Sequence, residues 1–165
     1  MPRARGSRVS TDRVRAALVL LAVTCAAPAS AQEEDPILAA VLAQVAEEMM
    51  DESLRAEGGV ACLAVDPGGA PQSVEAEFLE RFADLPFVRR GAECEERPDG
   101  AVEIATDRPA VLITAGPIEW VSEDEAWVTV RYFRTALLSA QRLYRAVREE
   151  AGWVSLGQII RGTPI

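Results

Sequence analysis

Two cysteines, Cys62 and Cys94, have the widest choice of chemistry in this sequence. Cys62 lies inside the apolar run GVACLAVD, and Cys94 lies inside the acidic run AECEER. A thiol can act as a nucleophile, bind a metal ion or form a disulfide. The sequence contains no histidine, so a nucleophilic thiol would lack its usual base, and two thiols alone are an incomplete set of zinc ligands. The compartment in which the chain folds decides whether the two thiols are expected to pair.

The start of the chain has the three parts of a secretory signal peptide. Residues 1–15 contain five arginines and one aspartate, whereas residues 16–31 carry no charge and end in the small-residue pattern ASA. We therefore expect export to the periplasm or the extracellular space, with removal of residues 1–31. Two cysteines in an exported domain most often form a disulfide, so we predict a bond between Cys62 and Cys94.

Export would leave one domain, residues 32–165, with no further segment long enough to span a membrane. The apolar part of the signal peptide is itself shorter than the roughly 20 apolar residues of a typical spanning helix. Lipid attachment at Cys25 is the alternative to simple cleavage. The preceding Ala22 and Thr24 depart from the Leu-Ala-Gly or Leu-Ala-Ala pattern that bacterial lipoprotein signals resemble. The remaining domain is large enough to build its own hydrophobic core.

The expected domain is strongly acidic, but its C-terminal part is basic. Residues 32–165 hold twelve arginines, no lysine and 25 acidic residues, a formal charge of −13 that should repel nucleic acids and anionic membranes. Residues 126–165 are nevertheless net positive. Their arginines have two interpretations: ion pairs with acidic residues elsewhere in the fold, or a face that captures carboxylate or phosphate groups. The anion-binding face would consist of Arg131, Arg134, Arg142 and Arg145, with Trp127, Phe133 and Tyr144 nearby.

Carboxylates are plentiful, but no catalytic residue is predicted among them. Most fall on expected helix surfaces or in turns, where they lack the enclosure that an acid–base pair needs. Glu119 is the best candidate for a carboxylate-based enzyme, because it lies between Ile118 and Trp120 on a predicted strand. The sequence contains no Walker loop, dinucleotide fingerprint, nucleophile elbow or zinc-protease helix, and its acidic runs do not match an EF-hand. We therefore predict no metal and no cofactor.

Two helices are expected before the sheet. Residues 33–59 place apolar residues at helical spacing, with acidic residues mostly on the opposite side, which predicts one long amphipathic helix. Asp35 can cap its start, with Pro36 at the first helical position. Ser73 is expected to cap a second helix that runs to about Asp84.

The remaining segments follow strand patterns. Residues 60–65 form a short apolar run between glycine-rich turns, which is typical of a buried strand, and residues 87–90 can form another. Residues 98–110 are rich in turn formers and predict an exposed loop. The last third predicts an antiparallel meander with strands at residues 110–114, 118–121, 126–135, 141–148 and 153–160, and with Pro117 at a bend or an edge. The fold class is therefore α+β: a long N-terminal helix and a second helix packed on a curved antiparallel sheet, a meander.

The C-terminal strand pattern resembles that of known domains. The segments EAWVTVRYF, LYRAV and EEAGWVSL, within residues 110–160, look like the closing strands of small bacterial exported domains of unknown function. In the order of its elements, the chain also resembles NTF2-like and cystatin-like domains, in which helices pack on a curved sheet. NTF2-like enzymes often carry an Asp/His pair inside their cone, and that chemistry does not transfer to a sequence without histidine.

These observations favour an exported, non-enzymatic domain that binds a protein partner or a small anionic ligand, for example in a cavity between helix and sheet. A carboxylate-based enzyme and a structural envelope protein are the alternatives. A carboxylate with a raised pKa in a polar pocket would indicate the enzyme. A solid core with a large exposed apolar patch would indicate the structural protein.

Overall fold

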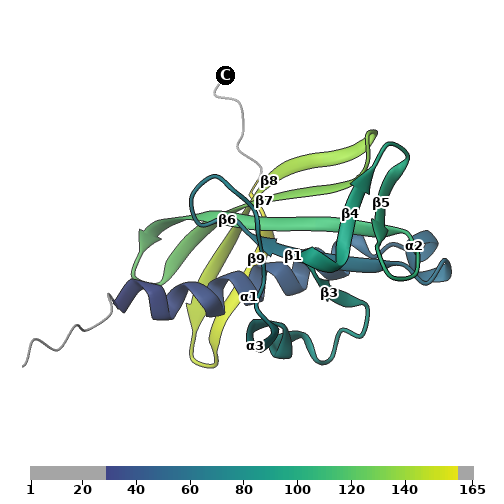
Figure 1. The fold of residues 1–165 in the computed structure, drawn as a ribbon. Helices are drawn as coiled ribbons and strands as arrows, with labels where there is room; N and C mark the ends of the chain where they lie inside the picture. The colour runs from purple at the N-terminus through teal and green to yellow at the C-terminus, as the bar shows by residue number, and fades with distance from the viewer. Residues whose placement is uncertain (1–28, 160–165) are drawn as a thin grey trace, which may run out of the picture.

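In the computed structural model, which describes residues 29–159, one long helix lies across one face of a twisted sheet (Figure 1). The predicted signal peptide and Cys25 fall outside the described residues, apart from residues 29–31, which begin the helix. The helical elements are α1 (Ala29–Met49), α2 (Glu52–Ala56), α3 (Ala76–Leu79) and the 3-10 turns η1 (Glu80–Phe82) and η2 (Gly91–Glu93). Among the described helices, only α1 is long.

The strands form a seven-stranded mixed sheet and a separate two-stranded hairpin. The large sheet contains β1 (Val60–Val65), β2 (Gln72–Ser73), β3 (Val88–Arg90), β6 (Ala110–Ser122), β7 (Glu125–Thr135), β8 (Leu138–Glu149) and β9 (Gly152–Gln158). The hairpin consists of β4 (Cys94–Arg97) and β5 (Gly100–Glu103). The predicted meander is confirmed, because β6 to β9 pair in sequence as antiparallel neighbours.

The sheet is mixed because β1 pairs in parallel with both β3 and β6, and only briefly antiparallel with β2. Parallel neighbours need a long crossover, and here the chain between β1 and β6 contains α3, β3 and the β4–β5 hairpin. Pro117 lies within β6, at a register shift between Ala115 and Ile118, and the pairing of β6 with β1 ends at Ala115. The position predicted as a bend or an edge is therefore irregular, although the strand continues beyond it.

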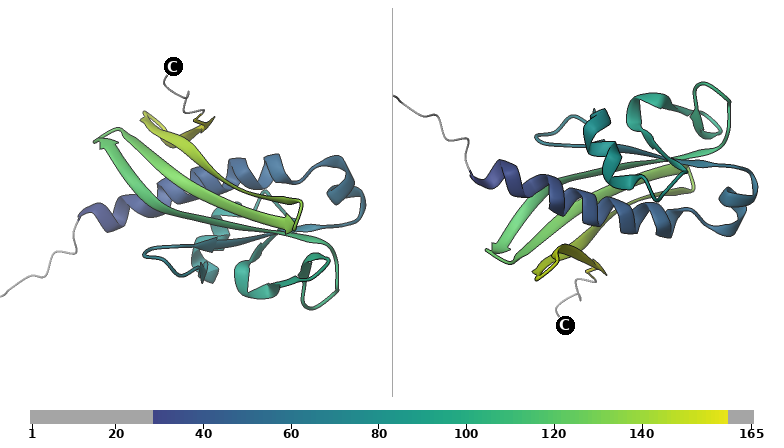
Figure 2. Two further views of the ribbon diagram at one scale, coloured as in Figure 1. Left: turned by 90° about the horizontal axis from the view of Figure 1, so that it is seen from above. Right: turned by 90° about the horizontal axis from the view of Figure 1, so that it is seen from below.

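The main core lies between α1 and the sheet. Figure 2 shows α1 crossing the strands on one side only. Val41, Leu42 and Val45 of α1 are fully buried, and they belong to one cluster with residues such as Ile113 and Val128 of the sheet. Each fully buried aliphatic side chain of this kind contributes about 1.5–3 kcal/mol of transfer free energy. We call the side of the sheet that carries Ile113 and Val128 the helix face, and the opposite side the outer face.

The first predicted helix is two helices in the structure. α1 begins well before Pro36, which lies inside the helix rather than at its first position. It ends before Asp51, whose backbone is extended and whose Oδ1 accepts a 2.7 Å hydrogen bond from the amide of Leu54. Asp51 therefore caps α2 and interrupts the single helix that residues 33–59 predict.

The second predicted helix is present but shorter than expected, and the predicted cap at Ser73 is wrong. Ser73 belongs to β2, and its Oγ accepts a 3.1 Å hydrogen bond from the amide of Ala92 instead of capping a helix. Only α3 and the turn η1 follow. Phe78 and Phe82 still lie together, with ring centroids 5.6 Å apart, and they pack at the edge of the main core.

The segment predicted as an exposed loop forms part of the hairpin, which covers the part of the outer face around Cys62 and Ala110. Figure 1 shows β4 and β5 on the side of the sheet opposite α1. Ala101 and Glu103 of β5 are buried. A second, smaller core lies under the hairpin and contains Cys62, Cys94 and Ala101.

Candidate functional site

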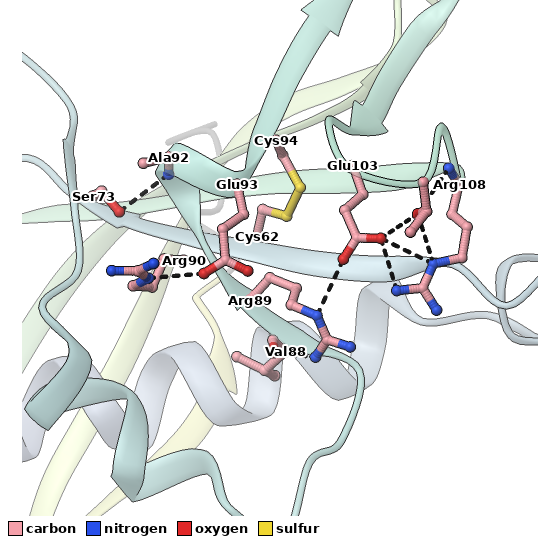
Figure 3. The surroundings of a disulfide bond; sticks show 11 residues. Cys62, Ser73, Val88, Arg89, Arg90, Ala92, Glu93, Cys94, Glu103 and Arg108 are labelled. Atoms are coloured by element: carbon pink, nitrogen blue, oxygen red, sulfur yellow. Dashed lines mark hydrogen bonds and ion pairs between the residues drawn. A yellow bond between two sulfur atoms is a disulfide. The ribbon is translucent and has the colours of Figure 1, made fainter.

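The predicted disulfide is present and joins the hairpin to the central strand. Cys62 lies in β1 with its side chain in the outer-face core, and Cys94 begins β4 (Figure 3). Their Cα atoms are 6.3 Å apart, and both residues are buried, with 1% and 9% exposure. A disulfide is consistent with folding in an oxidising compartment.

Two of the predicted anion-binding arginines, Arg134 and Arg142, lie on the helix face. Arg142 is directly across from Val130, which is buried in the main core. Its guanidinium carbon lies 5.1 Å from the ring centroid of Tyr132, a cation–π contact. Arg134 reaches past the end of α1 and donates from Nη1 to Asp51 at 2.7 Å.

The other two, Arg131 and Arg145, lie on the outer face. Arg145 is directly across from Trp127 of β7, so both side chains lie on the same face. Arg131 is four residues after Trp127 on β7 and therefore shares its face, opposite the buried Val130. Arg131 forms an ion pair with Asp66. Arg145 binds Glu125 with both Nε and Nη2, at 2.9 and 2.8 Å. The four arginines therefore do not form one surface. Arg131, Arg134 and Arg145 form ion pairs, whereas Arg142 contacts the ring of Tyr132. Anion binding by any of them stays a prediction.

Glu119 is exposed on β6, directly across from Trp127 on the outer face. An exposed carboxylate is solvated and lacks the low-dielectric surroundings that prepare a catalytic acid. The structure therefore does not place Glu119 in the enclosed polar pocket that a carboxylate-based enzyme would need.

Asp66, which follows β1, is one of two buried acidic residues among those whose burial the structure describes, with 5% exposure. It accepts hydrogen bonds from the amides of Gly68 and Gly69 and forms the ion pair with Arg131. The hydrogen bond from Gly69 is the main cause of a lowered pKa for Asp66, and it opposes the effect of burial. Asp66 is therefore a charged group that orders the turn after β1.

Glu103, the second buried acidic residue, joins two arginines from separate segments. Its Oε1 accepts from Arg89 Nε at 3.2 Å, and its Oε2 accepts from Arg108 Nη2 at 2.7 Å and from the hydroxyl of Thr106. Figure 3 shows Glu103 between the two guanidinium groups. The Thr106 hydrogen bond, followed by the arginines, lowers the pKa of Glu103 although burial alone would raise it. The sequence does not predict this cluster, because residues 98–110 are expected to form an exposed loop and Glu103 is therefore not expected to be buried.

Tyr144 is fully buried on the helix face, and its hydroxyl donates to Glu48 of α1 at 2.8 Å. Burial, followed by the nearby Glu48, raises the pKa of Tyr144 to about 12. The phenol therefore stays neutral and links α1 to β8.

Open clefts border the main core at several places. Two of them, of about 380 and 290 Å³, adjoin around Leu38 and Val65 and include acidic side chains such as Asp35. A smaller cleft of about 180 Å³ at the end of α1 contains Arg134 together with two carboxylates. A cleft of about 300 Å³ is different, because three arginines and no carboxylate line it. Its charged lining residues are Arg55, Arg89 and Arg108.

No family model matches this chain, and no curated protein or solved structure matches it. The resemblance to small exported bacterial domains and to NTF2-like and cystatin-like domains therefore stays a prediction. Within residues 29–159, no helix is long and apolar enough to cross a membrane, and no group of three or more side chains has the composition of a metal site.

Proposed function

We propose that this chain is an exported, disulfide-bonded domain that binds a small ligand or a protein partner and catalyses no reaction. The main support for the absence of catalysis is the ionisation state of the two buried carboxylates, Asp66 and Glu103. Asp66 and Glu103 both have lowered pKa values and both contact guanidinium groups, so both are ionised at neutral pH. A general acid needs the opposite environment, which raises its pKa.

The open clefts support a binding role. Ligand pockets have volumes of about 300–1,000 Å³ and combine an apolar lining with a few polar groups. The clefts beside Leu38 and the arginine-lined cleft reach or approach the lower end of that range.

A purely structural role would be favoured by one large exposed apolar patch. The large apolar side chains exposed among the described residues include Trp120 and Val121 near the β6–β7 turn, and Leu137 and Leu138 at the β7–β8 turn. Successive hairpin turns lie at opposite ends of their shared strand, here β7, so these pairs do not form one patch.

Titration of the carboxyl groups by ¹³C NMR tests the absence of catalysis. We expect Asp66 and Glu103 to titrate below their ordinary pKa values, and Asp66→Asn identifies the Asp66 signal. A carboxyl group in one of the clefts that titrates well above its ordinary value would refute the proposal and favour the enzyme.

A further inference from the structure

The arginine-lined cleft brings together three cations from separate parts of the chain. Arg55 comes from α2, Arg89 from β3 and Arg108 from the segment between β5 and β6. We propose that this cleft binds a small organic anion, whose carboxylate or phosphate group is held by the three guanidinium groups. The inference rests on the proposed binding function and names its ligand class.

The charge around this cleft is opposite to the charge of the whole chain, which is −9. The lining contains no acidic residue, whereas the three other clefts described above each contain at least two. Glu103 contacts Arg89 and Arg108 but does not line the cleft. Arg55 pairs with Glu47, at 2.6 Å between Nη2 and Oε2, and Glu47 does not line the cleft either. Two carboxylates therefore contact the three guanidinium groups, and a net positive charge remains.

Each of the three arginines also keeps hydrogen-bonding capacity. Arg55 donates from Nε to the carbonyl of Met50 and from Nη2 to Glu47. Arg89 donates from Nε to Glu103 and from Nη1 to the carbonyl of Pro86, and Arg108 donates from Nε and Nη2 to Glu103. Within residues 29–159, no acceptor contacts the remaining terminal nitrogen of any of them, which is Nη1 of Arg55 and Arg108 and Nη2 of Arg89. Each of these terminal nitrogens carries two N–H groups that can donate to oxygens of a carboxylate or phosphate group.

The rest of the lining is apolar and favours an anion with a flat or aliphatic body. Met50, Pro86 and Phe87 border the cleft, and the guanidinium carbon of Arg55 lies 5.4 Å from the ring centroid of Phe87. Gly58, whose φ is +67°, presents no side chain next to Arg108. A cleft of about 300 Å³ fits a small molecule.

The test is a titration of the disulfide-bonded protein with phenyl phosphate and with inorganic phosphate at constant ionic strength, followed by ¹⁵N–¹H NMR. The proposal predicts shifts at the amides of Gly58, Gly59 and Phe87, and tighter binding of phenyl phosphate than of inorganic phosphate because the phenyl group can contact Phe87. Arg55→Gln and Arg89→Gln should each weaken phenyl phosphate binding by about fivefold to tenfold.

Arg145→Gln is the charge-matched control, because Arg145 lies on β8 outside this cleft. Unchanged binding in that variant supports the proposal. Absence of shifts with both phosphates, or equal losses in all three variants, would overturn it. Shifts around Arg145 that disappear in Arg145→Gln would also overturn it while leaving a binding function intact.

The result does not depend on every variant folding. Arg55 has a side chain with 49% exposure and does not contact Glu103, and the shift map of the unmodified protein locates the site without any substitution. A different experiment tests the proposed function: the carboxyl titration would refute it if a carboxyl group in one of the clefts had a raised pKa.

Discussion

Replacement of both half-cystines by alanine measures how much the covalent link stabilises the fold. The disulfide joins residues that are 32 positions apart. In the chain-entropy model, a loop of this length contributes about 3–4 kcal/mol at 25 °C. Cys62 and Cys94 are also buried, so losing both sulfurs removes about 1 kcal/mol more of packing. We therefore expect Cys62→Ala/Cys94→Ala to lose about 4–5 kcal/mol of unfolding free energy.

Urea unfolding of the oxidised protein and of the double variant gives this difference. The expected loss corresponds to a midpoint lowered by about 2 M, and reductant should lower the midpoint of the unmodified protein but not that of the variant. Hydrogen exchange should accelerate more at Ala101, in the hairpin, than at Val128, in the main core, because the hairpin is attached through the disulfide. A loss of less than about 1 kcal/mol would refute the reasoning.

Three further substitutions, with Leu137→Ala as a control, test the packing and the buried polar groups. Glu103→Gln should cost about 1–3 kcal/mol at neutral pH. The folded-state pKa of Glu103 is lowered from 4.5, so the stability that its ionised form contributes is present above pH 4.5 and is lost as the pH falls through the folded-state pKa. The urea unfolding curves of the unmodified protein and of Glu103→Gln should therefore converge in acid. A gap between the curves that does not change with pH would contradict this pH dependence. Leu42→Ala should cost about 2–5 kcal/mol by urea unfolding, whereas Leu137→Ala, at a position with 95% exposure, should cost almost nothing. Tyr144→Phe, which removes the hydrogen bond to Glu48, should cost only about 0.5–1.5 kcal/mol, and a much larger loss would show that the hydroxyl has a further role.

Local patterns predict this fold well where the pattern and the tertiary surroundings agree. The alternation over residues 126–135 corresponds to β7, whose alternate residues are buried against α1, and the apolar run over residues 60–65 corresponds to β1. The pattern over residues 33–59 misplaces the end of α1, because apolar spacing continues past Asp51 while the Asp51 carboxylate caps a new helix. Side-chain capping competes with helix continuation, and the outcome depends on local geometry that periodicity does not contain.

Pairing between distant segments explains what the sequence does not predict. The parallel pairing of β1 with β3 and β6 depends on a crossover of many residues, and no turn signal marks it. The same pairing positions Arg89, while β5 positions the carboxylate of Glu103. The arginine-lined cleft therefore has no local sequence signal. The disulfide could be predicted, because the expected export and the cysteine count suffice for that prediction.

The intact mass of the protein recovered from the exported fraction, measured without reductant, shows whether the chain is exported, cleaved and disulfide-bonded. We expect a chain that begins at Gln32 and is lighter by two hydrogens than its reduced form, with no thiol available for alkylation. A folded protein that keeps Met1 and carries Cys62 and Cys94 as free thiols would contradict it.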